Sequence, residues 1–395
     1  MNNITRFPVR YFQRTPGQHP LNKETSLTQR IQNFCSSSQP TNTAKKLFVI
    51  SGSGATTARS LILKALAVGD VIGLSSKDLK KSEVPGLKFV QLSSEDLKNP
   101  AVVAKKIQSR ITEQGEIHYE KISALNLIGG ALAPKDSSLE ILNKDLPSGF
   151  FRGVHMLAEN MSSSFAMGGI SSIAARISSS DCKYASVKRA ADEAFCELGE
   201  EFGASTTILR PGIILENFSS EERLSPGHDY SPEQFSNKFI HMLVGSGNQL
   251  QQPVTVDCLF DALLNGLDIP GQRVVNAVSD KALTMRDLFM RFSRRKTVIQ
   301  ARVPYFLAEH AVEIAPRGRF QSYAIQMLKE QDMNPEKNVP ICSKDFSELL
   351  TSKKPISFEE FYKPQVDLVV SPPPYLEHLT QYSINLFEKM KKHIS

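Results

Sequence analysis

The chain has 395 residues, of which 41% are hydrophobic and 22% are charged, and its formal net charge is +6. This composition is ordinary for a soluble globular protein that forms one large domain or two unequal lobes. The excess charge lies in residues 1–46, where seven lysines and arginines stand against one glutamate. Since the remaining chain is electrically balanced and has no net field to attract phosphates, we do not expect a nucleic-acid partner.

The N-terminal stretch, residues 1–45, is basic and rich in Ser, Thr, Asn and Gln. That composition partly fits a mitochondrial transit peptide, but Pro8, Pro16 and Pro20 break any amphipathic helix and favour a disordered or surface-wrapping tail. No apolar run approaches the ~18 residues of a membrane span, so we expect no transmembrane segment. The five cysteines form no C-x-x-C pair, which indicates a reducing compartment. We therefore predict a cytoplasmic protein, or a mitochondrial one if the basic stretch is a transit peptide.

From residue 46 onward, the sequence alternates short apolar runs with amphipathic stretches. Strands are predicted at residues 47–50, 71–74, 87–90, 122–127, 169–172 and 206–209. Helices are predicted at residues 58–67, 101–111, 150–165 and 183–202. Apolar strands that alternate with amphipathic helices are typical of a parallel, doubly wound α/β sheet of the Rossmann type. Ligands of such sheets bind at the carboxyl ends of the strands.

Beyond residue 210 the predicted elements are shorter and less regular. Strands are expected at residues 253–257 and 273–277, and helices at residues 258–267, 284–292 and 304–314. They indicate a smaller lobe over the cleft, where substrate specificity would reside. The predicted organisation is a tail at 1–45, a nucleotide-binding Rossmann domain at 46–215, a smaller substrate lobe at 216–365, and a Pro-rich linker with a C-terminal amphipathic helix at 366–395.

Residues 51–59 form a glycine-bearing turn between the first predicted strand and the first helix. Glycines at such a turn let the backbone approach a pyrophosphate, whose charge is met by the N–H groups of the helix N-terminus. Gly52 fills the first small position of the fingerprint, and Ala58 with either Ala55 or Thr56 would fill the others. A tight turn that binds nothing is the alternative. The residues expected to contact the pyrophosphate are Gly52, Ser53, Ala55, Thr56 and Thr57.

The end of the second predicted strand bears on the choice of nucleotide. An acidic residue at this position would bind the adenosine ribose hydroxyls and select NAD. The chain instead has Ser76 and Lys77 here, so a 2′-phosphate is better accommodated and NADP(H) is preferred over NAD(H). Arg59, at the start of the first helix, is either a second phosphate partner or a solvated helix residue.

Tyr184 and Lys188 lie one helical turn apart and so project from the same face of their predicted helix. A phenol with its ordinary pKa of ~10 is a poor acid–base catalyst at neutral pH. A neighbouring ammonium would lower that pKa, and the same lysine could hydrogen-bond the nicotinamide ribose. Ser172 could hold a substrate oxygen against the tyrosine hydroxyl. Tyr184, Lys188 and Ser172 are therefore the candidate catalytic residues.

The order of these motifs resembles that of the short-chain dehydrogenase/reductase superfamily over roughly residues 46–365. In that family a Gly-rich first turn, an N-x-A-G-like turn, a serine and a Y-x-x-x-K pair follow one another, here at Gly52, residues 126–129, Ser172 and residues 184–188. The resemblance implies that the turn at residues 126–129 and the segment after the sixth strand meet the cofactor. The further cofactor-binding residues are then Asn126, Gly129, Pro211 and Ile213.

Residues 253–257, 276–279 and 345–350 resemble the C-terminal lobe of the extended and atypical branches of this family. The sequence also departs from the family pattern. The second and third glycines of the first turn are missing, and the spacing from Ser172 to Tyr184 is 12, one short of a common value that Ser171 would restore. The choice between the two serines therefore stays open. The family's asparagine on the helix after the fourth strand has no clear match; Asn143 and Asp145 are the candidates.

The sequence thus predicts an oxidoreductase that transfers a hydride between NADP(H) and a carbonyl or alcohol substrate. Two alternatives stay open: a non-catalytic NADPH-binding structural or assembly protein, and a nucleotide-sugar epimerase or dehydratase. The expected partner is a small-molecule substrate of undefined identity, with a homodimer or an assembly partner as further options. No metal site is expected, because His155, His228 and His241 lack the spacing of metal ligands.

Overall fold

The computed structural model describes residues 45–54, 57–76, 84–113, 117–129, 136–176, 182–215, 240–292, 297–314, 318–350 and 368–370. Residues 1–44, which make up nearly all of the predicted tail, lie outside the described residues. So does the predicted C-terminal helix. Ala55, Thr56, Lys77 and His228 lie outside them too.

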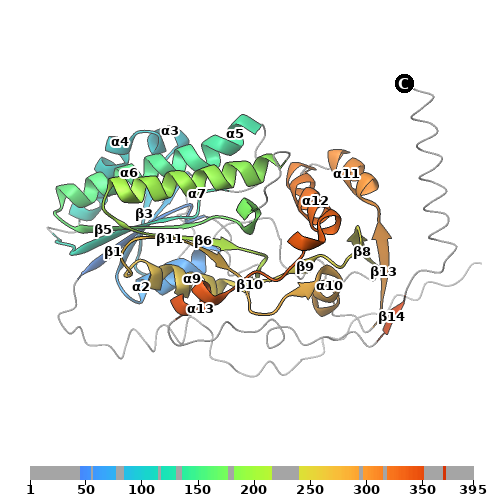
Figure 1. Cartoon of the computed structure of the whole chain (residues 1–395). Coiled ribbons are helices and arrows are strands. Elements are labelled where there is room, and N and C mark those ends of the chain that lie inside the picture. The colour runs from blue at the N-terminus through green and yellow to red at the C-terminus, as the bar shows by residue number, and fades with distance from the viewer. Residues whose placement is uncertain are drawn as a thin grey trace, which may run out of the picture. The chain divides into compact units, whose positions relative to one another are not determined.

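A seven-stranded parallel sheet forms the centre of the described part of the chain, with the order β11-β6-β5-β4-β1-β2-β3 (Figure 1). Its strands are β1 (Lys46–Ser51), β2 (Asp70–Ser75), β3 (Leu87–Gln91), β4 (Lys121–Asn126), β5 (Ser164–Ile170), β6 (Ser205–Pro211) and β11 (Gln272–Ala277). The predicted Rossmann-type, doubly wound α/β fold is confirmed.

Helices cover both faces of this sheet (Figure 1). On one face lie α3 (Ser94–Leu97), α4 (Pro100–Thr112), α5 (Asp136–Glu140), α6 (Leu146–Asn160) and α7 (Lys183–Glu201). The π-helical turn η1 (Ile141–Asp145) joins α5 to α6, and the 3₁₀ turn η2 (Ile173–Arg176) precedes α7. On the other face lie α2 (Ala58–Leu66), α9 (Val256–Gly266) and α13 (Lys344–Leu349).

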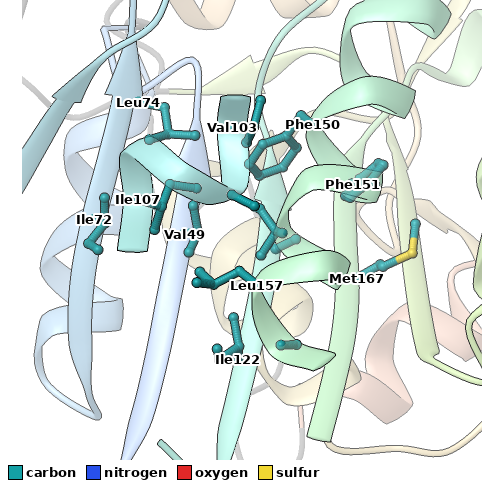
Figure 2. Close-up of a cluster of buried hydrophobic side chains, with 14 of the residues drawn as sticks. Val49, Ile72, Leu74, Val103, Ile107, Ile122, Phe150, Phe151, Leu157 and Met167 are labelled. Atoms are coloured by element: carbon teal, nitrogen blue, oxygen red, sulfur yellow. The ribbon is translucent and has the colours of Figure 1, made fainter. Parts of the chain in front are cut away.

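The apolar residues of the strands contribute to two cores, one on each face of the sheet. In β1, Leu47 and Val49 belong to a cluster with residues of α4 and α6, whereas Phe48 and Ile50 belong to a cluster with residues of α2 and α9. Successive side chains of a strand point to opposite faces, so this alternation is what a sheet covered on both sides requires. Figure 2 shows the first cluster, in which Phe150 of α6 lies close to Val103 of α4.

The fifth strand differs from the sequence prediction. A helix at 150–165 and a strand at 169–172 were expected, but α6 ends at Asn160 and β5 spans Ser164–Ile170. Ser162 adopts a φ of 52°, a left-handed conformation that ends the helical path. As a consequence, Ser171 and Ser172 lie beyond the carboxyl end of β5, in the loop where ligands bind in this type of sheet.

The expected domain boundary at residue 215 does not coincide with the edge of the main sheet. β11 lies within the range predicted as the substrate lobe, yet it pairs in parallel with β6 from Gln272 to Ala277. The strand expected at 253–257 is only β10 (Val254–Thr255), because the Thr255 hydroxyl accepts a hydrogen bond from Cys258 N and so caps α9 at once. The chain therefore returns to the Rossmann sheet after residue 253.

Within the described residues, three small sheets lie outside the main one: β7 (Ile214–Leu215) with β10, β9 (Leu250–Gln251) with β12 (Leu283–Thr284), and β8 (Ile240–Val244) with β13 (Thr297–Val303) and β14 (Leu368–Val370). They are accompanied by α10 (Met285–Phe292), α11 (Tyr305–Ile314), α12 (Gly318–Met333) and the 3₁₀ turn η4 (Pro335–Lys337). The sequence analysis did not predict β8, β13 or α12. None of the helices in the described ranges is long and apolar enough to cross a membrane; the cytoplasmic or mitochondrial location stays a prediction.

Two glycines let α6 approach α3 and α4 closely. A Cβ on Gly149 would overlap the carbonyl oxygen of Leu97, and a Cβ on Gly153 would lie 2.5 Å from Val103 Cβ. Both contacts are shorter than side chains tolerate, so backbone contact at these positions fixes the spacing between the helices.

We predict that Gly149→Ala lowers the free energy of unfolding by about 1–3 kcal/mol, because the overlap with the Leu97 backbone outweighs the gain of roughly 1 kcal/mol in helix propensity. Urea denaturation at neutral pH measures the change. Met156→Ala, on the exposed side of the same helix, is the control and should stay within about 0.5 kcal/mol of the parent protein. A stabilised Gly149→Ala protein would show that the helices can separate without cost.

Candidate active site

The carboxyl ends of β1 and β4 are joined by hydrogen bonds. The Ser51 hydroxyl donates to Asn126 Oδ1 at 2.7 Å, and Leu127 N donates to Ser51 O at 3.1 Å. β1 pairs with β2 on one side and with β4 on the other, so the chain reverses its direction of winding between these strands. Such a switch point is where open α/β sheets bind their ligands.

Gly52 opens the turn after β1, and two features require a glycine there. Its φ of +69° is left-handed, and a Cβ would lie 2.9 Å from the carbonyl carbon of Leu127. The turn after β1 therefore packs backbone to backbone on the turn after β4. A side chain at this position would separate the two turns that the sequence analysis assigns to the cofactor.

The rest of the first turn is partly occupied by internal contacts. Ser53 is buried, and both its backbone N and its hydroxyl donate to Leu74 O, at 3.1 and 2.9 Å. Its side chain thus links the turn to β2. Ala58 is fully buried at the first position of α2, where close packing needs a small residue, and Thr57 precedes it as the N-cap. Ala55 and Thr56, also predicted here, lie outside the described residues.

The predicted 2′-phosphate contacts are described only in part. Ser76 directly follows β2 and is exposed, and its carbonyl oxygen accepts a hydrogen bond from Gln91 Nε2 at 3.2 Å. Arg59 is half-buried at the second position of α2. Lys77 lies outside the described residues. An exposed serine follows the second strand here, and no acidic side chain occupies residues 74–76.

The turn after β4 carries Asn126 and Gly129. Asn126 is buried and fixes its own turn, because its Nδ2 donates to Ile128 O at 3.0 Å and its Oδ1 accepts from Ile128 N at 3.1 Å. Gly129 has a φ of +145°, and a Cβ there would lie 2.9 Å from Asn143 Oδ1 and 3.1 Å from Lys188 Nζ. The absence of a side chain at Gly129 therefore lets an amide and an ammonium approach the same turn.

Tyr184 lies in the first turn of α7, and its side chain is half-buried. Burial raises the pKa of its phenol to about 12; a hydrogen bond with Ser172 acts in the opposite direction, and the charges of Cys182 and Asp192 raise the pKa further. The expected lowering of this pKa by Lys188 is not seen, because desolvation is the largest effect. Ser172, and not Ser171, is the serine that contacts the phenol.

Lys188 lies one turn further along α7 and is buried, with only 5% of its surface exposed. Its Nζ is 5.8 Å from the centroid of the Tyr184 ring. Burial lowers the pKa of Lys188 to about 8, while the charge of Asp192 acts to raise it. At neutral pH the ammonium form therefore still predominates, although by a smaller margin than for an exposed lysine.

Asp192 continues the same face of α7 and was not identified from the sequence. It is buried, and its Oδ2 accepts a hydrogen bond from Arg210 Nε at 2.6 Å. Burial raises the pKa of Asp192, whereas Ser171, Arg210 and Lys188 all act to lower it. The i+4 spacing from Lys188 was the signal that could have revealed this residue.

Asn143 was only a candidate in the sequence analysis. It lies in η1, is buried, and donates from Nδ2 to Leu139 O at 2.8 Å, which leaves its Oδ1 directed at Gly129. π-helical turns often occur at functional sites. The other candidate, Asp145, is exposed. A small cavity of about 10 Å³ lies among these side chains, and residues lining it include Asn126, Asn143, Ser171, Lys188 and Asp192.

The remaining predicted residues follow β6. Pro211 is the last residue of this strand and is buried. Ile213 is half-buried, and its carbonyl oxygen accepts a hydrogen bond from Val254 N at 2.9 Å. β6 is the neighbour of β5, so these residues follow a strand end adjacent to the one that carries Ser172. From the smaller lobe, Met327 of α12 packs against the apolar cluster that includes Cys182 and borders Tyr184.

The described residues contain no cluster of three or more His, Cys, Asp or Glu side chains that could hold a metal ion. Among the predicted site residues in the described ranges, the structure brings Ser172, Tyr184 and Lys188 together and places Asn126 and Gly129 beside Lys188. The arrangement can donate a proton from a neutral phenol and place a cation next to the switch point.

Comparisons with known proteins bear on the fold. No protein-family model matches the sequence, and no curated protein matches it significantly. Among solved structures, the terminal R domain from the myxalamid PKS-NRPS biosynthetic pathway is 14% identical, with 80% of this chain and 87% of that chain covered and a TM-score of 0.54. Pal from Bacillus thuringiensis is 14% identical over 72% and 92% of the two chains, with a TM-score of 0.49. UDP-glucose 4-epimerase from Thermotoga maritima is 13% identical over 62% and 81%, with a TM-score of 0.47.

The likeness to the R domain extends over most of both chains, although few residues are identical. At this level of identity it concerns the fold. The comparison thus supports the Rossmann-type fold that the resemblance to the short-chain dehydrogenase/reductase superfamily implies.

Proposed function

We propose that the protein is an oxidoreductase that transfers a hydride between NADP(H) and a carbonyl or alcohol substrate. The observation that carries the proposal is the joint position of Ser172, Tyr184 and Lys188, with the serine hydrogen-bonded to the phenol and the ammonium 5.8 Å from its ring. These three side chains lie beside the turns that follow β1 and β4. Residues 74–76, at the end of β2, carry no acidic side chain, which favours NADP(H) over NAD(H).

The residues at the switch point fit a dinucleotide. Gly52 and Gly129 both have a positive φ, and a side chain at either would separate groups of the site: the Leu127 backbone from Gly52, and Asn143 and Lys188 from Gly129. Backbone N–H groups of the turn before α2 would hold the pyrophosphate, and Ser76 with Arg59 would face the 2′-phosphate. Lys188 and Asn126 would hold the nicotinamide end. The bound cofactor supplies the hydride, and the protein supplies orientation and the proton.

Tyr184 is suited to give a proton to a substrate oxygen. Since burial raises the pKa of Tyr184 to about 12, the phenol is protonated at pH 7. The Ser172 hydroxyl can donate a hydrogen bond to the same oxygen, and the Lys188 ammonium stabilises the negative charge that develops when the proton leaves. These properties favour reduction of a carbonyl at neutral pH over oxidation of an alcohol, which would begin from the phenolate.

We predict that Tyr184→Phe reduces kcat/KM for carbonyl reduction by about 10²–10⁴-fold, the usual contribution of a general acid, and leaves the NADPH-induced rise in Tm unchanged. Purified protein would be tested with NADPH on a panel of aldehydes, ketones and nucleotide sugars. Tyr119→Phe is the matched control. The Tyr119 hydroxyl donates to Asp70 at the amino ends of the strands, whereas the site lies at their carboxyl ends.

The outcomes separate the three functions. NADPH binding without turnover of any substrate would favour the non-catalytic structural or assembly protein. Conversion of a nucleotide sugar without net consumption of NADPH would favour an epimerase or dehydratase. Absence of any NADPH-induced change in Tm at high ligand concentration would contradict all three, because a ligand that binds the folded state must stabilise it.

We predict that Ser76→Asp reverses the nucleotide preference. A carboxylate after β2 repels a 2′-phosphate and can accept hydrogen bonds from ribose hydroxyls, so the affinity should fall about tenfold or more for NADPH and rise for NADH. Isothermal titration calorimetry with both nucleotides measures this change. Ser76→Asn has nearly the same shape without the charge and is the control. Equal affinities for NADPH in the parent and the Asp variant would remove Ser76 from the phosphate site.

We predict that kcat/KM for carbonyl reduction is level from about pH 6 to pH 7.5 and falls above pH 8. The sign follows from Lys188: its pKa is about 8, so the ammonium form is lost as the pH rises through this value, while Tyr184 keeps its proton throughout. A pH profile at subsaturating substrate measures the fall. In Lys188→Arg, whose guanidinium does not titrate in this range, the remaining activity should show no such fall. A fall that persists in this variant would assign it to another group.

A further inference from the structure

α7 presents three functional groups at successive helical turns: Tyr184, Lys188 and Asp192. Residues four apart on a helix lie above one another, so the carboxyl group of Asp192 is on the same face as the Lys188 ammonium. Asp192 is 1% exposed and Lys188 is 5% exposed. A buried carboxylate without a counter-ion is costly, so the presence of Asp192 at this position needs a physical account.

Arg210 of β6 fixes one oxygen of this carboxylate. Its Nε donates to Asp192 Oδ2 at 2.6 Å, and the side chain of Arg210 is itself only 21% exposed. The other oxygen, Oδ1, is buried, and the nearby Ser171 side chain acts together with Arg210 to favour the carboxylate form. The arginine therefore orients the carboxylate and leaves Oδ1 at the cavity that Lys188 also lines.

The other groups around Lys188 do not supply a negative charge. η1 presents the neutral amide of Asn143, the turn after β4 presents Gly129, and β6 presents the cationic Arg210. Tyr184, on the same helix, is a neutral phenol. Among the charged side chains in the described ranges, Asp192 is the one whose charge favours the ammonium form of Lys188.

We propose that Asp192 is a positioning residue: its carboxylate, oriented by Arg210, is the buried counter-ion that keeps Lys188 charged and directed at the Tyr184 ring and the turn at Gly129. The role in catalysis rests on the proposed function, but the charge state of Lys188 does not. Desolvation alone favours the neutral amine, so without Asp192 the lysine would lose its proton at a lower pH. Lys188 would then cease to stabilise the charge that develops on Tyr184.

The charge state can be measured directly by NMR. Protein labelled with ¹³C at the lysine ε carbon is titrated from pH 6 to pH 11 without nucleotide, and the Lys188 signal is assigned by its loss in Lys188→Arg. We expect a midpoint near pH 8 in the parent protein. In Asp192→Asn the midpoint should fall by about one pH unit, because the charge that favours the ammonium form is removed.

Matched variants separate this role from a structural one. Asp192→Glu keeps the charge and should restore the midpoint towards that of the parent. The double variant Asp192→Asn/Arg210→Gln removes both partners, so a destabilising lone arginine does not complicate the result, and its midpoint should also fall. Glu201→Gln is the control, since it breaks the exposed ion pair with Arg152 at the far end of the same helix and should leave Lys188 unchanged.

Turnover gives a second readout. In Asp192→Asn, kcat/KM for NADPH-dependent reduction should be lower at pH 7.5 and recover as the pH is reduced, because protonation of Lys188 is restored. If kcat/KM fell only because packing was lost, it would not recover when the pH is reduced. A Lys188 midpoint that stays near pH 8 in both the single and the double variant would overturn the proposal, even where NADPH-dependent turnover is found. A lowered midpoint in a protein that does not bind NADPH would support the counter-ion role and reject the proposed function.

Discussion

The hydrogen bond of 2.7 Å between Ser51 and Asn126 is the contact on which the rest of the candidate site depends. Both side chains are buried at the carboxyl ends of adjacent parallel strands, where an unpaired hydroxyl or amide would be costly. The bond draws together the turns after β1 and β4, and the positive φ of Gly52 lets their backbones touch. Asn126 also fixes the turn that leads to Gly129. The position of the Lys188 ammonium beside Gly129 therefore depends on the same contact.

Electrostatics then determines what the site can do. The fall in the pKa of Lys188 from 10.5 to about 8 corresponds to roughly 3 kcal/mol against the ammonium form. Burial has the opposite effect on the charge-bearing acids, since it raises the pKa values of both Tyr184 and Asp192. Each group is thus moved towards its neutral state, and for Lys188 and Asp192 the attraction between their charges resists the move. Arg210 supplies part of that resistance from β6, outside the helix that carries the other groups.

The sequence allowed much of the sheet to be predicted, because buried parallel strands are short apolar runs with turns at their ends. It misplaced β5, where Met167 and Phe165 fit a helical pattern as well as a strand and only the turn at Ser162 decides. It could not show that β11 joins β6, since pairing between distant strands leaves no local signal. The catalytic pair was predictable from its i+4 spacing. The choice between Ser171 and Ser172 was not, because it depends on which side of the loop faces Tyr184.

The spacing of Tyr184, Lys188 and Asp192 on α7 explains how one helix can position most of the candidate site's functional groups. Three side chains at successive turns form a line about 12 Å long, at 1.5 Å per residue over eight residues. A proton donor, a cation and an anion follow one another along it, so the pairing of Lys188 with Asp192 is set by helix geometry and needs no loop to position it. Loops contribute only the groups that meet this line from outside: Ser172 at the phenol and Gly129 at the ammonium. The helix fixes the order of the three groups through local sequence spacing. The short turns at the strand ends fix which other groups reach them, and these turns are positioned by the parallel sheet.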